Sequence, residues 1–253
     1  MAGIPRSGNP AVGGIMDYVR SRRLQPGDRL PSERDFAERL GIGRNAVREA
    51  IATLVALRVV EARPNSGIYL RRYEKDSSFE ALVMLAGLGE VPDATEVDET
   101  MAVREHLELL AVGLACRHRT AHDVERLEGV LRETRAALAA GEGIAAWDTE
   151  FHLAVAEAAH NSVLVRVLNA FYQFTAPRRE VMFRDAQQSS RTLTEHMELL
   201  ASVRAGDEPA ARRLMLTHMA RARTYWSVVF DEGKPSLEES AGAAHAPPTH
   251  LSP

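Results

Sequence analysis

The sequence predicts a mainly α-helical chain in two parts: a small N-terminal domain of helices with one β-hairpin, followed by a longer all-helical bundle. Three observations support this fold class. Apolar residues recur at helical spacing along most of the chain, strand-like segments are confined to residues 59–70, and 253 residues suffice for two modest domains. The content of 45% hydrophobic and 26% charged residues excludes a wholly disordered or collagen-like chain.

The first predicted helix begins at Pro10, because proline suits the first turn of a helix. Its apolar face is formed by Val12, Ile15, Met16 and Val19. A short helix over residues 33–40 follows. The capping-box pattern of Ser32 with Asp35 opens this helix, and Gly41 stops it.

A longer helix is predicted over residues 44–57, directly after the connection at 41–44. A short helix, a tight glycine-containing turn and a longer helix make a helix-turn-helix. The β-prone segments 59–62 and 68–70 are separated by residues 63–67, whose Pro, Asn and Gly favour a hairpin. This hairpin is expected to form the wing of a winged helix-turn-helix.

Charge is divided unevenly between the two parts. Residues 1–73 carry thirteen arginines against seven acidic residues, whereas residues 74–253 carry 18 basic and 28 acidic residues. Clustered basic charge together with a winged helix-turn-helix favours double-stranded DNA as the partner. The alternative is a small helical domain with a hairpin that binds no ligand.

The second part shows helical periodicity and no strand signal. Its predicted helices cover residues 78–88, 94–119, 121–140, 143–160, 162–183, 189–205 and 208–230. Pro177 lies within one of these helices and is expected to kink or split it. In helical ligand-binding domains such a break often shapes a cavity.

These patterns divide the chain into a flexible N-terminus at 1–9, a winged helix-turn-helix domain at 10–73, a linker at 74–77, an all-helical domain at 78–231 and a disordered tail at 232–253. The longest apolar run, residues 81–86, is far shorter than a membrane span. The single cysteine, Cys116, cannot form an internal disulfide. We therefore expect a cytoplasmic protein with no membrane partner.

Four residues of the helical part suggest a metal site. Asp148 and His152 are four residues apart on a predicted helix, so their side chains share one face. His196 and His218 are equidistant from position 207, where the chain turns, so they lie at the same height of a helical hairpin. Three imidazoles and one carboxylate can bind a first-row divalent metal. The alternative is a set of core histidines that donate to backbone carbonyls.

Arg104 lies among apolar residues of the predicted helix over 94–119. Such an arginine either lays its stem along the surface or, beside a metal cavity, clamps a carboxylate with two hydrogen bonds. The other histidines of the predicted helices flank helix ends or polar stretches and are expected to be exposed: His106, His118, His122 and His160.

Two sets of motifs resemble a known family. The segments at 30–37, 40–50 and 67–70, which read LPSERDFA, LGIGRNAVREA and GIYL, resemble the winged helix-turn-helix of the GntR family of bacterial transcription regulators. Farther along, the chain is similar to the all-helical FCD effector domain of the FadR subfamily. The matching positions are residues 103–108, residues 148–152, Asn161, His196, Gly206, Asp207 and His218. Together the two resemblances cover about residues 10–231.

The resemblance implies a homodimeric regulator that binds a palindromic operator, with repression as the expected outcome. By matching position, the residues that contact DNA would be Arg34, Arg44, Asn45, Arg48 and, at the tip of the wing, Gly67. Arginine suits this role because its guanidinium pairs with O6 and N7 of guanine. Gly43 departs from the family pattern, which has Ser or Thr there, and removes a hydroxyl that would cap a helix and contact phosphate.

The same resemblance implies that Asp148, His152, His196 and His218 bind a divalent transition metal, such as Zn, Ni, Mn or Fe. Arg104 matches the arginine that faces a small organic carboxylate effector in this branch. Effector binding would then alter the affinity of the winged domains for DNA.

Two other functions fit the same residues. In one, the metal itself is the signal and no organic effector binds. In the other, the cluster is the metal centre of an enzyme, which would need a general base or an activated water. The nearest acidic candidates are Glu150 and Glu157, and Glu150 points to a different helical face from Asp148 and His152. The DNA-reading domain argues against an enzyme.

Overall fold

The computed structural model describes residues 9–88 and 94–231, and the chain divides into two compact units, Met1–Glu90 and Val91–Pro253. Each unit is described by itself. The flexible N-terminus expected before residue 9 and the disordered tail expected at 232–253 lie outside the described residues. The mainly helical fold class is confirmed.

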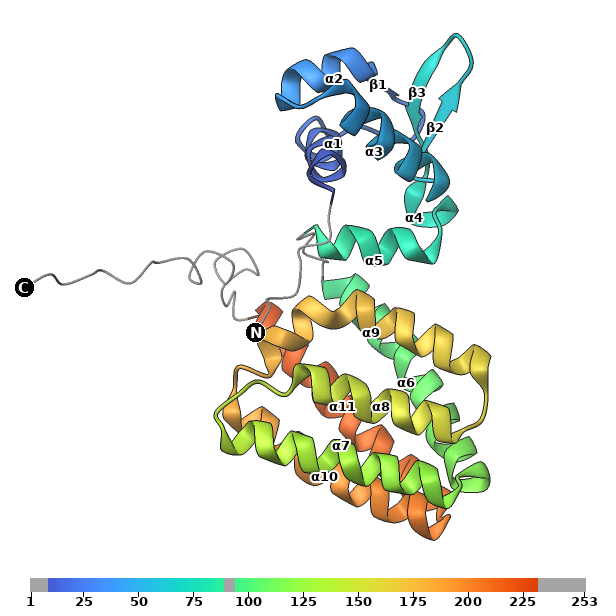
Figure 1. Ribbon diagram of the computed structural model, residues 1–253, viewed down its shortest axis with the longest axis vertical. Coiled ribbons are helices and arrows are strands. Elements are labelled where there is room, and N and C mark those ends of the chain that lie inside the picture. The colour runs from blue at the N-terminus through green and yellow to red at the C-terminus, as the bar shows by residue number, and fades with distance from the viewer. Residues whose placement is uncertain (1–8, 89–93, 232–253) are drawn as a thin grey trace, which may run out of the picture. The chain divides into compact units, whose positions relative to one another are not determined.

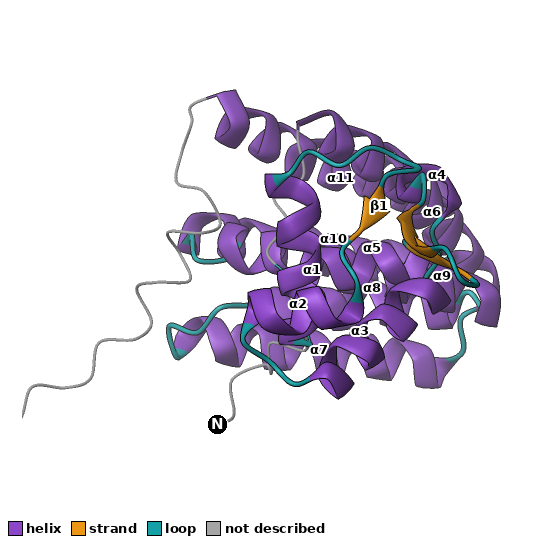
Figure 2. Cartoon of the chain, turned by 90° about the horizontal axis from the view of Figure 1, so that it is seen from above, coloured by secondary structure: helices purple, strands orange, loops and turns teal. Residues whose placement is uncertain are grey.

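The first unit contains the predicted helix-turn-helix and hairpin (Figure 1). Its elements are α1 (Pro10–Ser21), β1 (Arg29–Leu30), α2 (Glu33–Leu40), α3 (Arg44–Ala56), β2 (Val60–Arg63), β3 (Gly67–Leu70), α4 (Tyr73–Asp76) and α5 (Phe79–Gly87). The sheet is antiparallel in the order β1-β3-β2. All strands of the described residues lie in this unit, as Figure 2 shows.

The helix-turn-helix is fixed by local capping and by a small apolar core. The side chains of Ser32 and Asp35 form the predicted capping box at the start of α2, and Gly41 ends this helix in the left-handed conformation at φ 65°. Gly43 precedes α3 and supplies no side-chain cap. The core between the helices contains Ile15, Met16, Phe36, Val47 and Leu54, none of which exposes any surface.

The wing is the hairpin of β2 and β3, in which Val60 pairs with Leu70 and Arg63 pairs with Gly67. Gly67 has a φ of 126°, a conformation that favours glycine. The sequence analysis placed both strands within one residue of these bounds. It missed β1, because a strand of two residues is too short to show an alternating pattern.

Helix α5 belongs to the first unit, whereas the sequence analysis expected it in the second. The sequence analysis assigned residues 78–88 to the all-helical domain, whereas Ala81 and Leu85 are buried in the core of the first unit. Periodicity reveals that a helix has an apolar face, but it does not reveal which core that face enters. The short helix α4 occupies the expected linker at 74–77.

The second unit is the predicted all-helical bundle. Its helices are α6 (Ala94–His118), α7 (Ala121–Ala139), α8 (Ala145–Ala158), α9 (Ser162–Met182), α10 (Ala186–Ala205) and α11 (Glu208–Asp231). Helix α6 packs against α8 and α11, and α10 packs against α7 and α11. Cys116 is buried on α6 in the core of the bundle.

Pro177 was expected to kink or split its helix; a split is wrong, because α9 continues through the proline as one helix, and a kink stays a prediction. A single missing N–H donor is therefore tolerated within a helix of 21 residues. None of the helices in the described part of the chain combines the length and apolar character needed to cross a bilayer.

Candidate functional site

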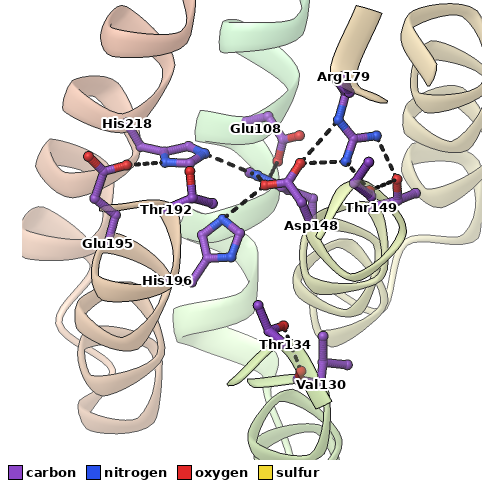
Figure 3. Close-up of polar contacts among 12 residues, drawn as sticks. Glu108, Val130, Thr134, Asp148, Thr149, Arg179, Thr192, Glu195, His196 and His218 are labelled. Carbon is purple, nitrogen blue, oxygen red and sulfur yellow. Dashed lines mark hydrogen bonds and ion pairs between the residues drawn. The ribbon is translucent and has the colours of Figure 1, made fainter. Parts of the chain in front are cut away.

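The structure brings together the four residues of the predicted metal site. Asp148 and His152 lie on α8, His196 on α10 and His218 on α11, and all four are buried. Figure 3 shows Asp148, His196 and His218 pointing toward one another. One ligand atom of each residue lies within 4.8 Å of the corresponding atom of every other. Gly206, at φ 73°, ends α10 in the left-handed conformation and allows α11 to begin directly afterwards.

The distances between the donor atoms suit a single ion. The Nε2 atoms of His152 and His218 are 3.2 Å apart, and Asp148 Oδ1 lies 3.5 Å from His196 Nε2. Ligands bonded to a metal at roughly 2.1 Å lie about 3 Å apart when adjacent and about 4 Å apart when opposite. His196 Nε2 is buried without a hydrogen-bond partner in the protein. An uncommitted buried nitrogen beside a carboxylate and two imidazoles fits a divalent transition metal.

A carboxylate lies behind each of two ligand histidines. Glu108 Oε2 is 3.1 Å from His152 Nδ1, and Glu195 Oε2 is 2.6 Å from His218 Nδ1. Because an ionised carboxylate only accepts hydrogen bonds, each Nδ1 must donate, which leaves Nε2 free to bind a metal. Glu195 is itself held by Arg221, whose Nη2 donates to Glu195 Oε2 over 2.8 Å.

Asp148 is held by Arg179 as well as by the histidines. Arg179 Nε donates to Asp148 Oδ2 over 3.1 Å, and a second nitrogen of the same guanidinium donates to the same oxygen. Burial alone would raise the pKa of Asp148, but the positive charge of Arg179 holds that pKa well below its usual range. The carboxylate is therefore ionised and presents Oδ1 to the cluster.

Burial lowers the pKa of His196 well below its usual range, and it also lowers the pKa of His218. Both imidazoles are therefore neutral near pH 7. A neutral imidazole is the form that binds a metal.

A series of hydrogen-bonded side chains links the buried Arg104 to His152. Its Nη2 donates to the hydroxyl of Tyr172, and that hydroxyl donates to Glu108 Oε1. Arg104 Nε lies 3.5 Å from Glu108 Oε1 without hydrogen-bond geometry and has no hydrogen-bond partner. Burial alone would raise the pKa of Glu108, but His152, Arg104 and Tyr172 together lower it to about 2.

A small cavity of about 20 Å³ is lined by Arg104 and by two of the four predicted metal ligands, Asp148 and His218. Its other lining residues are Met101, Arg179, Met182, Phe183, Thr192, Ala222 and Trp226. A wider open groove of about 410 Å³ lies between α7 and α10, but no member of the Asp/His cluster lines it. Of these two pockets, the small cavity adjoins the Asp/His cluster.

The residues expected to contact DNA lie on the first unit. Arg34 on α2 and Arg44, Asn45 and Arg48 on α3 are exposed, and Gly67 begins β3 at the wing. Arg48 Nε is 3.4 Å from Glu33 Oε2, an exposed ion pair that is weak in water. These positions leave the four polar side chains accessible, and their DNA contacts stay a prediction.

Sequence reasoning missed four residues of the site: Glu108, Tyr172, Arg179 and Glu195. The spacing of Arg104 and Glu108, four residues apart on one helix, was a usable signal. Glu195 directly precedes His196 in the chain but serves His218 on the next helix, so its role depends on packing. The four remaining histidines of the bundle are exposed, as expected.

Comparison with known proteins relates both units to transcription regulators. Residues 12–70 match the family model described as bacterial regulatory proteins, gntR family, and residues 99–221 match the FCD domain. The HTH-type transcriptional regulator LutR of Bacillus subtilis (strain 168) is 31% identical over 219 residues, covering 85% of this chain and 98% of that protein. The Uxu operon transcriptional regulator of Escherichia coli (strain K12) is 28% identical over 221 residues, covering 83% of this chain and 82% of that protein.

A solved structure of Lar, which controls the expression of the Listeria monocytogenes agr system, superposes with a TM-score of 0.64 at 18% identity. The superposition covers 90% of this chain and 99% of that chain. At this identity the likeness concerns the fold alone. It extends over both units of the chain described above.

Proposed function

The chain belongs to the GntR family of bacterial regulatory proteins and carries an FCD domain, and from this premise we propose that a bound metal and a small organic carboxylate control its affinity for operator DNA. It is a DNA-binding transcriptional regulator, and its families and relatives are regulators rather than enzymes. Working as a homodimer in the bacterial cytoplasm, where the DNA lies, it reads a palindromic operator and represses transcription.

The observation that carries the proposal is the buried cluster of Asp148, His152, His196 and His218, with its uncommitted nitrogen. These residues would hold a Zn, Ni, Mn or Fe ion. A divalent ion with open positions would supply a Lewis acid that binds a carboxylate oxygen. The carboxylates Glu108 and Glu195 orient two of the imidazoles toward the ion.

Arg104 supports a carboxylate as the effector. Its guanidinium is buried, lines the same cavity as Asp148 and His218, and keeps Nε without a hydrogen-bond partner. Glu108 and the Tyr172 hydroxyl already contact this guanidinium, so what it offers a ligand is the single Nε–H donor, which a carboxylate oxygen could accept. A carboxylate that bridges the metal and Arg104 would satisfy both groups.

The coupling between operator binding and effector binding must be reciprocal. An effector that weakens operator binding must itself bind the DNA-bound dimer more weakly, by the same factor. Calorimetry with a panel of hydroxy-, keto- and sugar-acids on wild-type, metal-stripped and Arg104→Ala protein tests the site. We expect the ligand that releases DNA to bind only the metal-loaded wild type with full affinity. Equal binding to all three proteins would place the pocket elsewhere.

The chief alternative is regulation by the metal alone. Titration of operator affinity with metal, in the absence of any organic acid, separates the two functions. A full operator response to metal, unchanged by every acid of the panel, would favour that alternative.

A further inference from the structure

We infer that Arg29, on β1, is a further DNA-contacting residue, which pairs with a backbone phosphate beside the wing, and that Gly67 leaves the room that this arginine needs. The inference concerns the first unit and depends on neither the metal nor the effector. It is carried by the position of Arg29 on the sheet, by its close approach to Gly67 and by its uncommitted guanidinium.

Strand β1 links the two parts of the first unit that are expected to reach DNA. It directly precedes α2, where Arg34 lies in the first turn, and it pairs with β3 of the wing, where Arg29 is opposite Tyr69. The neighbouring pair of Leu30 and Ile68 is buried, so Arg29 lies on the opposite, exposed face of the sheet. Because the first helix of a helix-turn-helix crosses the DNA backbone, a cation between α2 and the wing is well placed for a phosphate.

The side chain of Arg29 crosses β3 at Gly67. A Cβ at this position would lie 2.7 Å from Arg29 Nε and 3.2 Å from its Nη2, and the first distance is much shorter than an ordinary contact between unbonded atoms. Any other residue at position 67 would therefore push the guanidinium away. Gly67 thus has a second role besides its φ of 126°, because it lets Arg29 reach across β3 toward the hairpin turn.

Arg29 is the uncommitted one of the two arginines on this sheet. Arg63, on β2, forms an ion pair with Glu61, and its guanidinium carbon lies 4.2 Å from the centre of the Tyr69 ring. Arg29 is exposed and forms no ion pair or side-chain hydrogen bond within the described part of the chain. The hairpin turn at 64–66 contains no basic residue. Arg29 is therefore the charge that this sheet offers to a phosphate without breaking an existing pair.

The chemistry of the contact is that of a guanidinium and a phosphodiester. Two N–H groups of an arginine can donate to two oxygens of one phosphate in a planar, charge-assisted pair. A phosphate contact positions the protein on DNA without reading its sequence. Arg29 should therefore add affinity for every duplex, whereas Arg44 and Arg48 on α3 are expected to add specificity.

The experiment measures the salt dependence of DNA binding by the full chain, with a random-sequence duplex and with a duplex selected for tight binding. Arg29→Ala should weaken binding to both duplexes by the same factor. The slope of log affinity against log salt should become shallower by about 0.9 for each Arg29 that is engaged. Arg29→Lys keeps the charge and should retain most of the slope.

Arg22→Ala is the matched control, since Arg22 is an exposed arginine of the same unit at the end of α1. It removes the same charge and should leave the slope of the wild type unchanged. Thermal melts of Arg29→Ala should match the wild type, because its side chain has no partner to lose. Arg29→Ala with the slope of Arg22→Ala would overturn the contact, and a loss confined to the selected duplex would overturn the assignment to phosphate.

A double-mutant cycle tests the role of Gly67. Gly67→Ala should weaken binding to the random duplex more in the wild type than in Arg29→Ala, because the backbone strain is common to both backgrounds and the displaced guanidinium is not. Equal losses in the two backgrounds would show that Gly67 acts without Arg29 and would overturn this part of the inference.

Discussion

The Nε2 atoms of His152 and His218 lie 3.2 Å apart in the buried core of the helical unit, although their parent helices α8 and α11 are separated by two other helices in the chain. Two ring nitrogens at this distance share either a proton or an ion. The carboxylates behind them, Glu108 and Glu195, orient both nitrogens toward the same point.

Replacing His196 by alanine should lower the metal content and the thermal stability together, because a bound metal stabilises the folded state by mass action. The measurement is metal analysis combined with thermal melts in the presence and absence of added metal. His122→Ala is the matched control, since His122 is an exposed histidine of the same unit and is not a member of the cluster. Undiminished metal stoichiometry in the His152→Ala/His196→Ala double variant would reject the site.

Replacing Glu195 by glutamine should weaken metal binding by about 10- to 100-fold while leaving all four ligands in place. The amide can no longer act as the ionised acceptor for His218 Nδ1. Competition with a chelator measures the affinity, and Glu195→Asp should restore part of it. Glu198→Gln removes an exposed charge from the same helix and should have no effect. Equal metal affinity in Glu195→Gln and Glu198→Gln would show that Glu195 does not orient the ligand.

Replacing Arg44 or Arg48 by alanine should weaken specific operator binding more than binding to random DNA. Each good pairing of arginine with guanine contributes about 1–3 kcal/mol of discrimination. Gel-shift titrations on operator and random duplexes at fixed salt measure both affinities. Arg166→Ala removes the same charge from an exposed site in the helical unit and serves as the control. An equal loss on both duplexes would mean that the two arginines contact phosphates only.

Replacing Gly43 by serine should raise stability by a few tenths of a kcal/mol, because serine caps a helix slightly better than glycine. The site can accept the change, since nothing lies within 4 Å of the added Cβ and the backbone φ is −66°. The hydroxyl should also add a phosphate contact and raise affinity for operator and random DNA alike. Gly43→Ala tests the Cβ without the hydroxyl. If Gly43→Ala matches Gly43→Ser in DNA affinity, the hydroxyl plays no part.

Thr120 and Asp123 form a capping box at the start of α7. Its carboxylate should make the free energy of unfolding depend on pH in the acid range. Burial would raise the pKa of Asp123, but hydrogen bonds from Thr120 and His160 lower it below the usual value of 3.8. A carboxyl with a lowered pKa stabilises the folded state above its unfolded pKa, and this contribution is lost as the pH falls through the folded pKa. The stability difference between wild type and Asp123→Asn should therefore stay constant at neutral pH and shrink below about pH 4. A difference that persists undiminished at pH 2 would contradict this account.

The ligand set could be predicted because its spacings are properties of helices alone. Residues four apart share a face, and residues equidistant from a tight turn share a height. Glu108 offered only the weaker signal of its spacing from Arg104, because a glutamate on a helix is usually exposed and the packing of α6 against other helices buries this one. Packing also decides which core a helix enters, so α5 could be predicted as a helix from its sequence but was expected in the wrong core.

Cys116 gives the chain a built-in chemical reporter. It is the one thiol in the sequence, it lies buried on α6, and burial raises its pKa, so the reactive thiolate is scarce in the folded protein. A reagent can alkylate this buried sulfur only when the helical bundle opens transiently. The alkylation rate therefore measures how often the helical unit opens, without any engineered label. A bound metal or effector that stabilises the closed bundle should slow the reaction.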